Sequence, residues 1–294
     1  MKVIGTGSVL LLLLMLMVSA CQQEIDFENL TATQNDSAYL SKMIAVDTTL
    51  PAGADTVEKT FFSYDARKRL VKINFRDLTD GDSVREEFFY AGNDTLPYKR
   101  VYHDFINFPV ASYYRLDMFY TYQQGKVLKD SVIEWDMNGP APAPSGATVT
   151  IYNDQGSQVI KTKRYYNYIA GNHVFDRQES NTYMVTRLNG NIVSYTDTTS
   201  FPPYYETIQT TYDNKFNPLN KIFKVQYPAF EFLSYENTQS QLNNPLTRNY
   251  VDLNGPGSDT FSYVYRNDGY PVICRSHEQP VNRYTKFSYY YTAL

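Results

Sequence analysis

The side chains best able to bind a metal or transfer a proton are three histidines, each followed closely by a carboxylate. The pairs are His103 and Asp104, His173 and Asp176, and His277 and Glu278. Imidazole and carboxylate are typical zinc ligands. Counting strands places His103 and His173 about four strands apart, which is roughly 19 Å in an open sheet. His277 lies further away still, so we predict no metal site and no cofactor.

Cys274 is the one thiol with a histidine close to it in sequence, since His277 follows three residues later. It lies in the apolar string YPVIC, which favours a packed core thiol, with a catalytic Cys–His pair as the alternative.

Glu86 and Glu87 are adjacent on a predicted strand. Neighbouring strand residues point to opposite faces, so these two carboxylates should not share a substrate.

Two acidic turns resemble calcium-binding loops. They are DLTDGDSVREE, with Asp77, Asp80, Asp82 and Glu86, and DLNGPGSD, with Asp252, Asn254 and Asp259. Neither has the spacing of an EF-hand, and turns rich in Asp and Asn also form without metal. The sequence contains no G-x-S-x-G, H-E-x-x-H or glycine-rich phosphate loop, so no catalytic residues are predicted.

The elements that would position these groups are repeated hairpins. An aromatic segment ending in Tyr, a short polar turn and an aliphatic segment with Lys or Arg recur along the chain. The tyrosines are Tyr64, Tyr90, Tyr122, Tyr152, Tyr212, Tyr235 and Tyr265, with a degenerate copy at Leu188 and a last half-repeat in YYYTAL. Turns such as Asn189-Gly190 supply positive φ at low cost, as hairpins require.

The segments flanking the turns alternate with period two. In YRLDMFYTY, Tyr114, Leu116, Met118, Tyr120 and Tyr122 share one face, and Arg115, Asp117 and Thr121 share the other. This pattern predicts half-buried strands, and no amphipathic helix is expected after residue 37. We predict an all-β, antiparallel up-and-down meander of about 18 strands in a strongly curved or partly closed sheet.

The repeats resemble the YD-type repeats of RHS-like proteins. They are more similar to short YD-repeat lipoproteins of the Bacteroides group, in which a strand like YLSKMIAVD (Tyr39 to Asp47) precedes the first repeat. The resemblance covers nearly the whole mature chain and implies a fold more than an activity.

A membrane barrel is disfavoured, because Lys161 and Lys163 fall on one face of a strand and Arg164 on the other.

The N-terminal segment has the features of an export signal. Lys2 precedes the apolar run Val9 to Val18, which is half the length of a membrane span, and Ser19, Ala20 and Cys21 follow. The string VSAC resembles a lipobox, which implies cleavage after Ala20 and lipidation of Cys21. We therefore predict a signal peptide at 1–20, a lipidated Cys21 with a flexible tether at 21–36, and a single β-repeat domain at 37–294.

A binding site is predicted from the parity of the meander, in which successive turns alternate between two ends. The Tyr-anchored turns occupy one end, and the opposite connections are varied and contain most of the prolines. Loops on a rigid scaffold commonly hold binding residues. The longest of these connections after the first repeat, Asp136 to Ala147, directly follows Trp135. We predict Trp135, His103, Phe105 and Tyr204 as contacts.

These features predict a non-catalytic binding or interaction module. The formal net charge is −4 and no run of five basic residues occurs, which disfavours a nucleic-acid partner. We expect an outer-membrane lipoprotein held by the lipid on Cys21, with the face of the membrane left open. A cell-surface protein or glycan is the expected partner. A glycan-binding accessory protein of a polysaccharide uptake system is the alternative, and a hydrolase is less favoured.

Overall fold

The structure is a computed structural model that describes residues 38–50, 55–107, 111–123, 125–199, 205–226, 241–252 and 255–293. Sixteen strands and one helix occur in these residues. They are β1 (Ala38–Asp47), β2 (Thr56–Tyr64), β3 (Leu70–Asp77), β4 (Ser83–Phe89), β5 (Lys99–Ile106), β6 (Ser112–Gln123), β7 (Lys126–Asp136), β8 (Ala143–Asp154), β9 (Gln158–Ile169), β10 (Asn172–Leu188), β11 (Asn191–Thr199), β12 (Tyr205–Phe216), α2 (Leu219–Gln226), β13 (Asn243–Asp252), β14 (Gly255–Tyr265), β15 (Pro271–Gln279) and β16 (Arg283–Ala293). The predicted signal peptide, Cys21 and tether lie outside the described residues.

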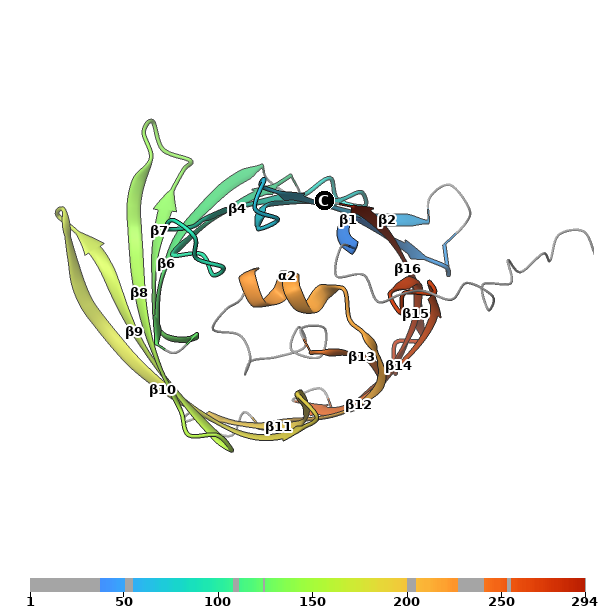
Figure 1. The fold of residues 1–294 in the computed structure, drawn as a ribbon. Coiled ribbons are helices and arrows are strands. Elements are labelled where there is room, and N and C mark those ends of the chain that lie inside the picture. Colours follow the sequence, from blue (N-terminus) through green and yellow to red (C-terminus); the bar gives the residue numbers. More distant parts are fainter. Residues whose placement is uncertain are drawn as a thin grey trace, which may run out of the picture.

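The strands form an antiparallel up-and-down meander that closes into a barrel, because β1 pairs with β16 (Figure 1). The all-β meander is confirmed. The predicted count of about 18 strands is wrong, since the described residues contain 16, and the sheet is closed where partial closure was predicted. The hairpin predicted around Tyr235 lies outside the described residues. Helix α2 follows β12, and β12 pairs directly with β13.

Pairing register separates the two faces of the wall. Arg100 pairs with Met118, and Tyr102 pairs with Leu116, so these side chains share a face. Arg100 donates to the backbone oxygen of Gln226 in α2 at 2.9 Å, and α2 lies within the ring of strands (Figure 1). This face is therefore the lumenal one. The alternation predicted for Tyr114 to Tyr122 is confirmed, with the aromatic and aliphatic set pointing into the lumen.

The outer face of the wall mixes charged side chains with exposed apolar ones such as Phe61, Phe119 and Ile151. Charged side chains alternate with the lumenal positions and point outward on ten strands: Lys42, Lys59, Lys72, Arg85, Lys99, Arg115, Lys129, Arg164, Arg275 and Lys286. Hydroxyl pairs such as Thr211 with Thr247, at 2.7 Å, occupy outward positions elsewhere. A Lys or Arg facing lipid at mid-membrane costs about 2–4 kcal/mol. This distribution suits a wall that faces water.

The repeat tyrosines form a ring inside one end of the barrel. Several of these hydroxyls donate to a backbone oxygen in the first part of the preceding hairpin, as Tyr64 does to the Leu40 oxygen at 2.8 Å and Tyr90 to the Leu70 oxygen at 2.6 Å. The same bond recurs from Tyr122 to Pro97, Tyr212 to Ile192 and Tyr291 to Pro271. Tyr152 and Tyr265 donate instead to the carboxylates of Asp130 and Asp213. Register shifts fall at Tyr64, Tyr122, Tyr212 and Tyr265. The ring thus ties hairpins together where the strands leave regular pairing.

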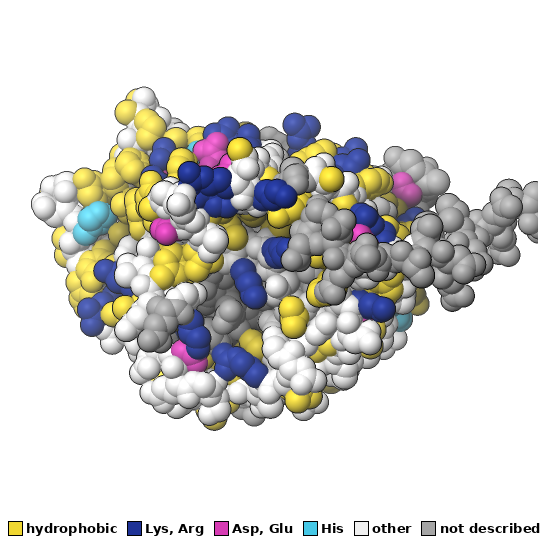
Figure 2. Space-filling view, in the orientation of Figure 1, with side chains coloured by type: hydrophobic (Ala, Val, Ile, Leu, Met, Phe, Trp, Pro, Cys, Tyr) yellow, Lys and Arg dark blue, Asp and Glu magenta, His cyan; other side chains and the backbone are white. Residues whose placement is uncertain are grey.

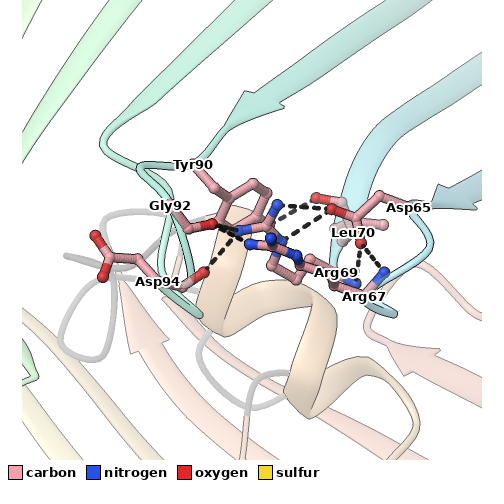
Figure 3. Close-up of polar contacts among 7 residues, drawn as sticks. All are labelled: Asp65, Arg67, Arg69, Leu70, Tyr90, Gly92 and Asp94. Carbon is pink, nitrogen blue, oxygen red and sulfur yellow. Dashed lines mark hydrogen bonds and ion pairs between the residues drawn. The ribbon is translucent and has the colours of Figure 1, made fainter.

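The turn after Tyr64 shows how neighbouring repeats are joined (Figure 3). Asp65 accepts hydrogen bonds from the backbone amides of Arg67 and Arg69, both at 2.9 Å, which fixes the turn. Arg69 then reaches the next repeat. Its guanidinium lies 4.4 Å from the Tyr90 ring centroid and donates to the Gly92 oxygen at 3.0 Å. The basic residue of the motif therefore connects one hairpin to the next.

Helix α2 is two turns long and was not predicted from the sequence. Asn217 caps it by accepting from the Leu219 amide at 3.0 Å, and Leu219 and Ile222 are buried. They pack with Leu40, Phe62 and Phe88 in the lumenal core. A second core lies under β9 to β12 and includes Val159, Tyr183, Val185, Ile192, Tyr195 and Ile208. No helix among the described residues is long and apolar enough to cross a membrane.

The predicted parity of the connections is correct. Strand β8 runs from Ala143 to Asp154, so the proline connection after Trp135 and the turn at Asp154 lie at opposite ends. We call these the loop end and the Tyr-turn end, the latter defined by the turns after Tyr64, Tyr90, Tyr122, Tyr152, Leu188, Tyr212 and Tyr265. The predicted loop Asp136 to Ala147 is shorter than expected. Ala143 and Pro144 already pair with β7, so only residues 137–142 connect the strands.

Candidate ligand-binding site in the barrel lumen

The lumen contains a cavity of about 380 Å³ between the walls formed by β5 to β9. Pockets for small molecules usually begin near this size. Its lining combines tyrosine rings, aliphatic side chains, two threonines and five charged groups: Arg100, Tyr102, Leu116, Met118, Tyr120, Asp130, Val132, Glu134, Thr148, Thr150, Tyr152, Lys161 and Lys163. All of them occupy lumenal register positions, because alternate residues of five consecutive strands face the same space.

A buried ion pair at the edge of the cavity holds α2. The Nε of Arg100 lies 2.7 Å from Oε2 of Glu86, and both side chains are almost fully buried. Arg100 also donates to the Gln226 backbone oxygen, while the Gln226 side chain donates to Oε1 of Glu86 at 2.6 Å. The last residue of α2 is therefore clamped to β4 and β5. Since Arg100 is already engaged by Glu86, its charge is neutralised within the protein.

Lys161 and Lys163 are the two cations that face the cavity without an ion pair among the described residues. They alternate on β9, opposite Tyr152 and Thr150 of β8. Burial, together with the charge of neighbouring Lys163, lowers the pKa of Lys161 to about 8 against the attraction of Asp130 and Asp197. A desolvated ammonium gains most from a ligand that accepts hydrogen bonds or carries negative charge.

Acceptors lie on β7, which β8 separates from β9. Asp130 of β7 accepts a hydrogen bond from the Tyr152 hydroxyl at 2.5 Å, and burial raises the pKa of its carboxyl. Glu134 lies four residues further along β7 and also faces the lumen. Four residues of strand span roughly 13 Å, whereas glycoside hydrolases hold their two carboxylates about 5 to 9.5 Å apart. The spacing suits recognition better than hydrolysis.

The aromatic residues predicted from the loops lie on the outer wall near the loop end. His103 on β5 and Trp135 on β7 both flank Arg115 of β6, whose guanidinium lies 5.3 Å from the Trp135 ring centroid. Phe105 stacks on Tyr113 at 4.5 Å, and the Tyr113 hydroxyl lies 2.5 Å from Nδ1 of His103. Burial lowers the pKa of His103. Three predicted residues thus share one outer patch, and Tyr204 lies outside the described residues.

The other sequence candidates are structural groups. Cys274 is buried between Tyr263 and Tyr289, and burial raises the pKa of its thiol to about 12. It points into the lumen, whereas His277 points outward and stacks on Tyr284, so the two form no catalytic pair. Glu86 and Glu87 do point to opposite faces, with Glu87 paired to Arg85 at 3.0 Å.

The acidic turns use their carboxylates to hold backbone amides. Asp77 accepts from the amide of Thr79 at 2.7 Å, and Asp82 accepts from the amide of Asn107 at 2.6 Å. Glu86 is committed to Arg100, and Asp259 forms an ion pair with Arg248. In the described part of the chain, no group of three or more His, Cys, Asp or Glu side chains is arranged to hold a metal ion.

A second hollow, of about 500 Å³, lies toward the loop end along β12 to β15. Its lining is uncharged, with Gln209, Asn249, Tyr250 and Ser258 among the residues that form it. The Tyr250 ring lies across Gly257, where any Cβ would collide with it. This hollow offers amides and hydroxyls but no charged group, so the lumenal cavity has the stronger combination of donors, acceptors and aromatic surface.

Sequence reasoning missed the lumenal site. Lys161 and Lys163 were recognised as sharing a face, but only as an argument against a lipid-facing wall. The same alternation placed Tyr120 on the face that now lines the cavity. The available signal was that charged residues alternate with apolar ones on the buried face of consecutive segments, as in SVIEWD and KTKRYY. That pattern indicates a polar interior within a closed sheet.

Comparisons with known proteins give a structural neighbour only. No protein-family model matches the chain, and no curated protein sequence matches it. One solved structure that is similar to it is a porin-like protein from Bacteroides uniformis, with a TM-score of 0.35 and 10% sequence identity. That match covers 88% of this chain and 99% of the other. The site residues are therefore argued from this chain alone.

Proposed function

We propose that the protein is a lipid-anchored binding module whose water-facing barrel holds a small ligand in its lumen. The observation that carries the proposal is the pair Lys161 and Lys163, which face a tyrosine-lined cavity without an ion-pair partner in the described residues. Burying a cation without an ion-pair partner is unfavourable for folding. Such cations are retained mainly where a ligand supplies the missing contact. Lipidation of Cys21 and an outer-membrane location remain part of this proposal.

A sugar-like ligand fits this cavity best, which favours the glycan-binding role. Sugar hydroxyls both donate and accept hydrogen bonds, and their ring faces stack on aromatic side chains. The cavity offers acceptors on β7, donors on β9, and the rings of Tyr102, Tyr120 and Tyr152. A carboxylate on the sugar would add an ionic contact to Lys161 or Lys163. The wide spacing of Asp130 and Glu134 favours binding without hydrolysis.

Entry to the cavity is proposed from the loop end, because α2 packs against Leu40, Phe62 and Phe88 at the Tyr-turn end of the lumen. The outer patch of His103, Phe105 and Trp135 lies near that mouth on β5 and β7. In this proposal these residues contact the part of a longer ligand that extends outside the barrel. The resemblance to YD-repeat lipoproteins contributes the expectation of a surface role and no residue of the lumenal site.

The proposal is tested by titrating a panel of neutral and acidic oligosaccharides against the wild-type protein and two variants. The combined substitution Lys161→Met and Lys163→Met should weaken binding about 10- to 100-fold, as expected for losing hydrogen bonds to charged groups. Lys129→Met, on the outer wall, is the matched control and should bind as wild type. Equal binding by all three proteins would place the ligand elsewhere, and binding of simple organic acids alone would reject the sugar.

A further inference from the structure

The two ends of the barrel carry opposite charge. At the Tyr-turn end, exposed basic side chains come from several turns and from α2: Arg67, Lys68, Lys126, Arg187, Lys215, Lys221 and Lys224. The same turns also contain Asp65, Asp94, Asp154, Asp213 and Asp268, which the basic residues outnumber. At the loop end, the described turns and the strand ends beside them carry Asp47, Asp55, Asp77, Asp80, Asp82 and Asp136, against two basic residues, Arg76 and Arg283. Residues far apart in sequence therefore produce a charge difference along the barrel axis.

The basic side chains surround the hollow between α2 and the barrel wall. A cavity of about 250 Å³ there is lined by Lys126, Arg187 and Lys224, which come from two turns and the helix. Lys126 pairs with Asp154 at 2.7 Å. Figure 2 shows Lys and Arg side chains gathered around the central hollow, where Figure 1 draws α2. The face is broad and concave, with its positive charge spread over separate elements.

The first strand starts within this basic face. Tyr39 lies next to the beginning of β1, and its ring is 5.9 Å from the ammonium of Lys68 and 5.8 Å from that of Lys221. Residues 22–37 separate β1 from Cys21. A fully extended chain of that length reaches at most about 55 Å. A lipid on Cys21 would therefore be joined to the barrel at its Tyr-turn end, and since a tether of that length could also span the barrel, the charge of that end decides the orientation.

We propose that the Tyr-turn end docks on a bilayer surface that carries anionic lipid headgroups. The proposed tether joins the barrel at this end, and the positive charge of the end complements phosphate groups on the bilayer. Each Lys or Arg close to an anionic bilayer strengthens binding about fivefold. The acidic loop end then points away from the membrane and leaves the mouth of the lumen open to ligand. Attachment through the tether rests on the proposed lipid anchor, whereas the docking contact does not.

Vesicle co-sedimentation tests the contact without the lipid. The protein is the chain from residue 21 with Cys21→Ser, and the vesicles are pure phosphatidylcholine or equal parts phosphatidylcholine and phosphatidylglycerol. We expect binding to the anionic vesicles only, weakening as salt screens the charges. The triple variant Lys68→Glu, Lys221→Glu and Lys224→Glu should bind at least about 100-fold more weakly. The matched variant Lys59→Glu, Lys129→Glu and Lys286→Glu, on the outer wall, should keep most of the binding.

Two results would overturn the docking proposal, provided circular dichroism shows both variants folded. One is absence of binding to anionic vesicles, or equal binding to both compositions. The other is equal loss of binding in the two triple variants, which would show a response to net charge alone. Lys161 and Lys163 are unchanged in all these proteins. A negative result therefore leaves the lumenal site untouched, and the oligosaccharide titration judges that site separately.

Discussion

The two ends of the barrel share one kind of turn and differ in what joins their hairpins. Carboxylates accept from amides two residues further on at both ends, as Asp65 does at the Tyr-turn end and Asp77 at the loop end. Only the Tyr-turn end adds a repeated bond between hairpins, in which tyrosine hydroxyls such as those of Tyr64 and Tyr90 bind carbonyl oxygens of the preceding hairpin. The described loop-end connections are joined by bonds that do not repeat, such as that from the Asn107 amide to Asp82. One end is thus a repeated ring, while the other varies from loop to loop.

Alkaline pH should separate the two ends most strongly. Burial raises the pKa of Tyr64, Tyr90 and Tyr212 above the usual value of 10. Their folded-state pKa values lie above the unfolded ones, so the stability they contribute is complete below about pH 10 and is lost as pH rises further. We expect cooperative unfolding above pH 10, with the last phase of tyrosinate absorbance, from the buried tyrosines, coinciding with the change in circular dichroism. Ionisation of all the tyrosines well before unfolding would contradict burial of Tyr64, Tyr90 and Tyr212.

Breaking the clamp on α2 should produce the largest effect of a single substitution. Glu86→Ala leaves the buried Arg100 without its partner, which typically costs about 3–5 kcal/mol. Glu87→Ala, one residue away, removes an ion pair on the outer wall and should cost at most about 1 kcal/mol. Urea unfolding of both variants gives the comparison. Equal losses would mean that the clamp contributes no more than a surface ion pair.

Removing one hydroxyl from the ring should have the smallest effect. Tyr90→Phe keeps the aromatic packing under Arg69 but deletes the hydrogen bond to the Leu70 oxygen, which we expect to cost about 1 kcal/mol. Tyr290→Phe is the control, because Tyr290 is exposed on the outer wall and its ring contact with Lys42 survives the change. Thermal unfolding should distinguish them. If the Tyr90→Phe protein is as stable as the control, the tyrosine hydroxyls do not stabilise the Tyr-turn end, and the difference proposed between the two ends is wrong.

Local sequence patterns predicted the hairpins, the faces and the parity correctly because each depends on neighbouring residues. Period-two alternation around Met118 sets the face, and Asn189-Gly190 sets its turn. The repeat pattern missed helix α2 between β12 and β13. Asn217, Pro218 and the apolar spacing of Leu219, Ile222 and Phe223 are helix-start signals that the repeat pattern obscured.

Closure and the lumenal site depend on contacts between distant residues. Barrel closure requires β1 to pair with β16, as Met43 does with Tyr289, and no local pattern encodes that pairing. The clamp joins Gln226 to Glu86 across 140 residues of sequence. The cavity forms only when β5 to β9 curve around a common space. Composition could indicate which polar residues line the cavity. Only the closed sheet brings these residues together around one space.

The outer wall should face water while the protein is attached to the membrane. Arg164→Cys and Gln209→Cys place thiols at exposed outward positions of β9 and β12, in a protein whose Cys274 is buried. Labelling membrane fractions with a charged, membrane-impermeant maleimide after opening the cell envelope measures access directly. We predict that both thiols are labelled without detergent, at the rate of an exposed residue. Labelling that appears only after detergent would place the wall in lipid and contradict the account.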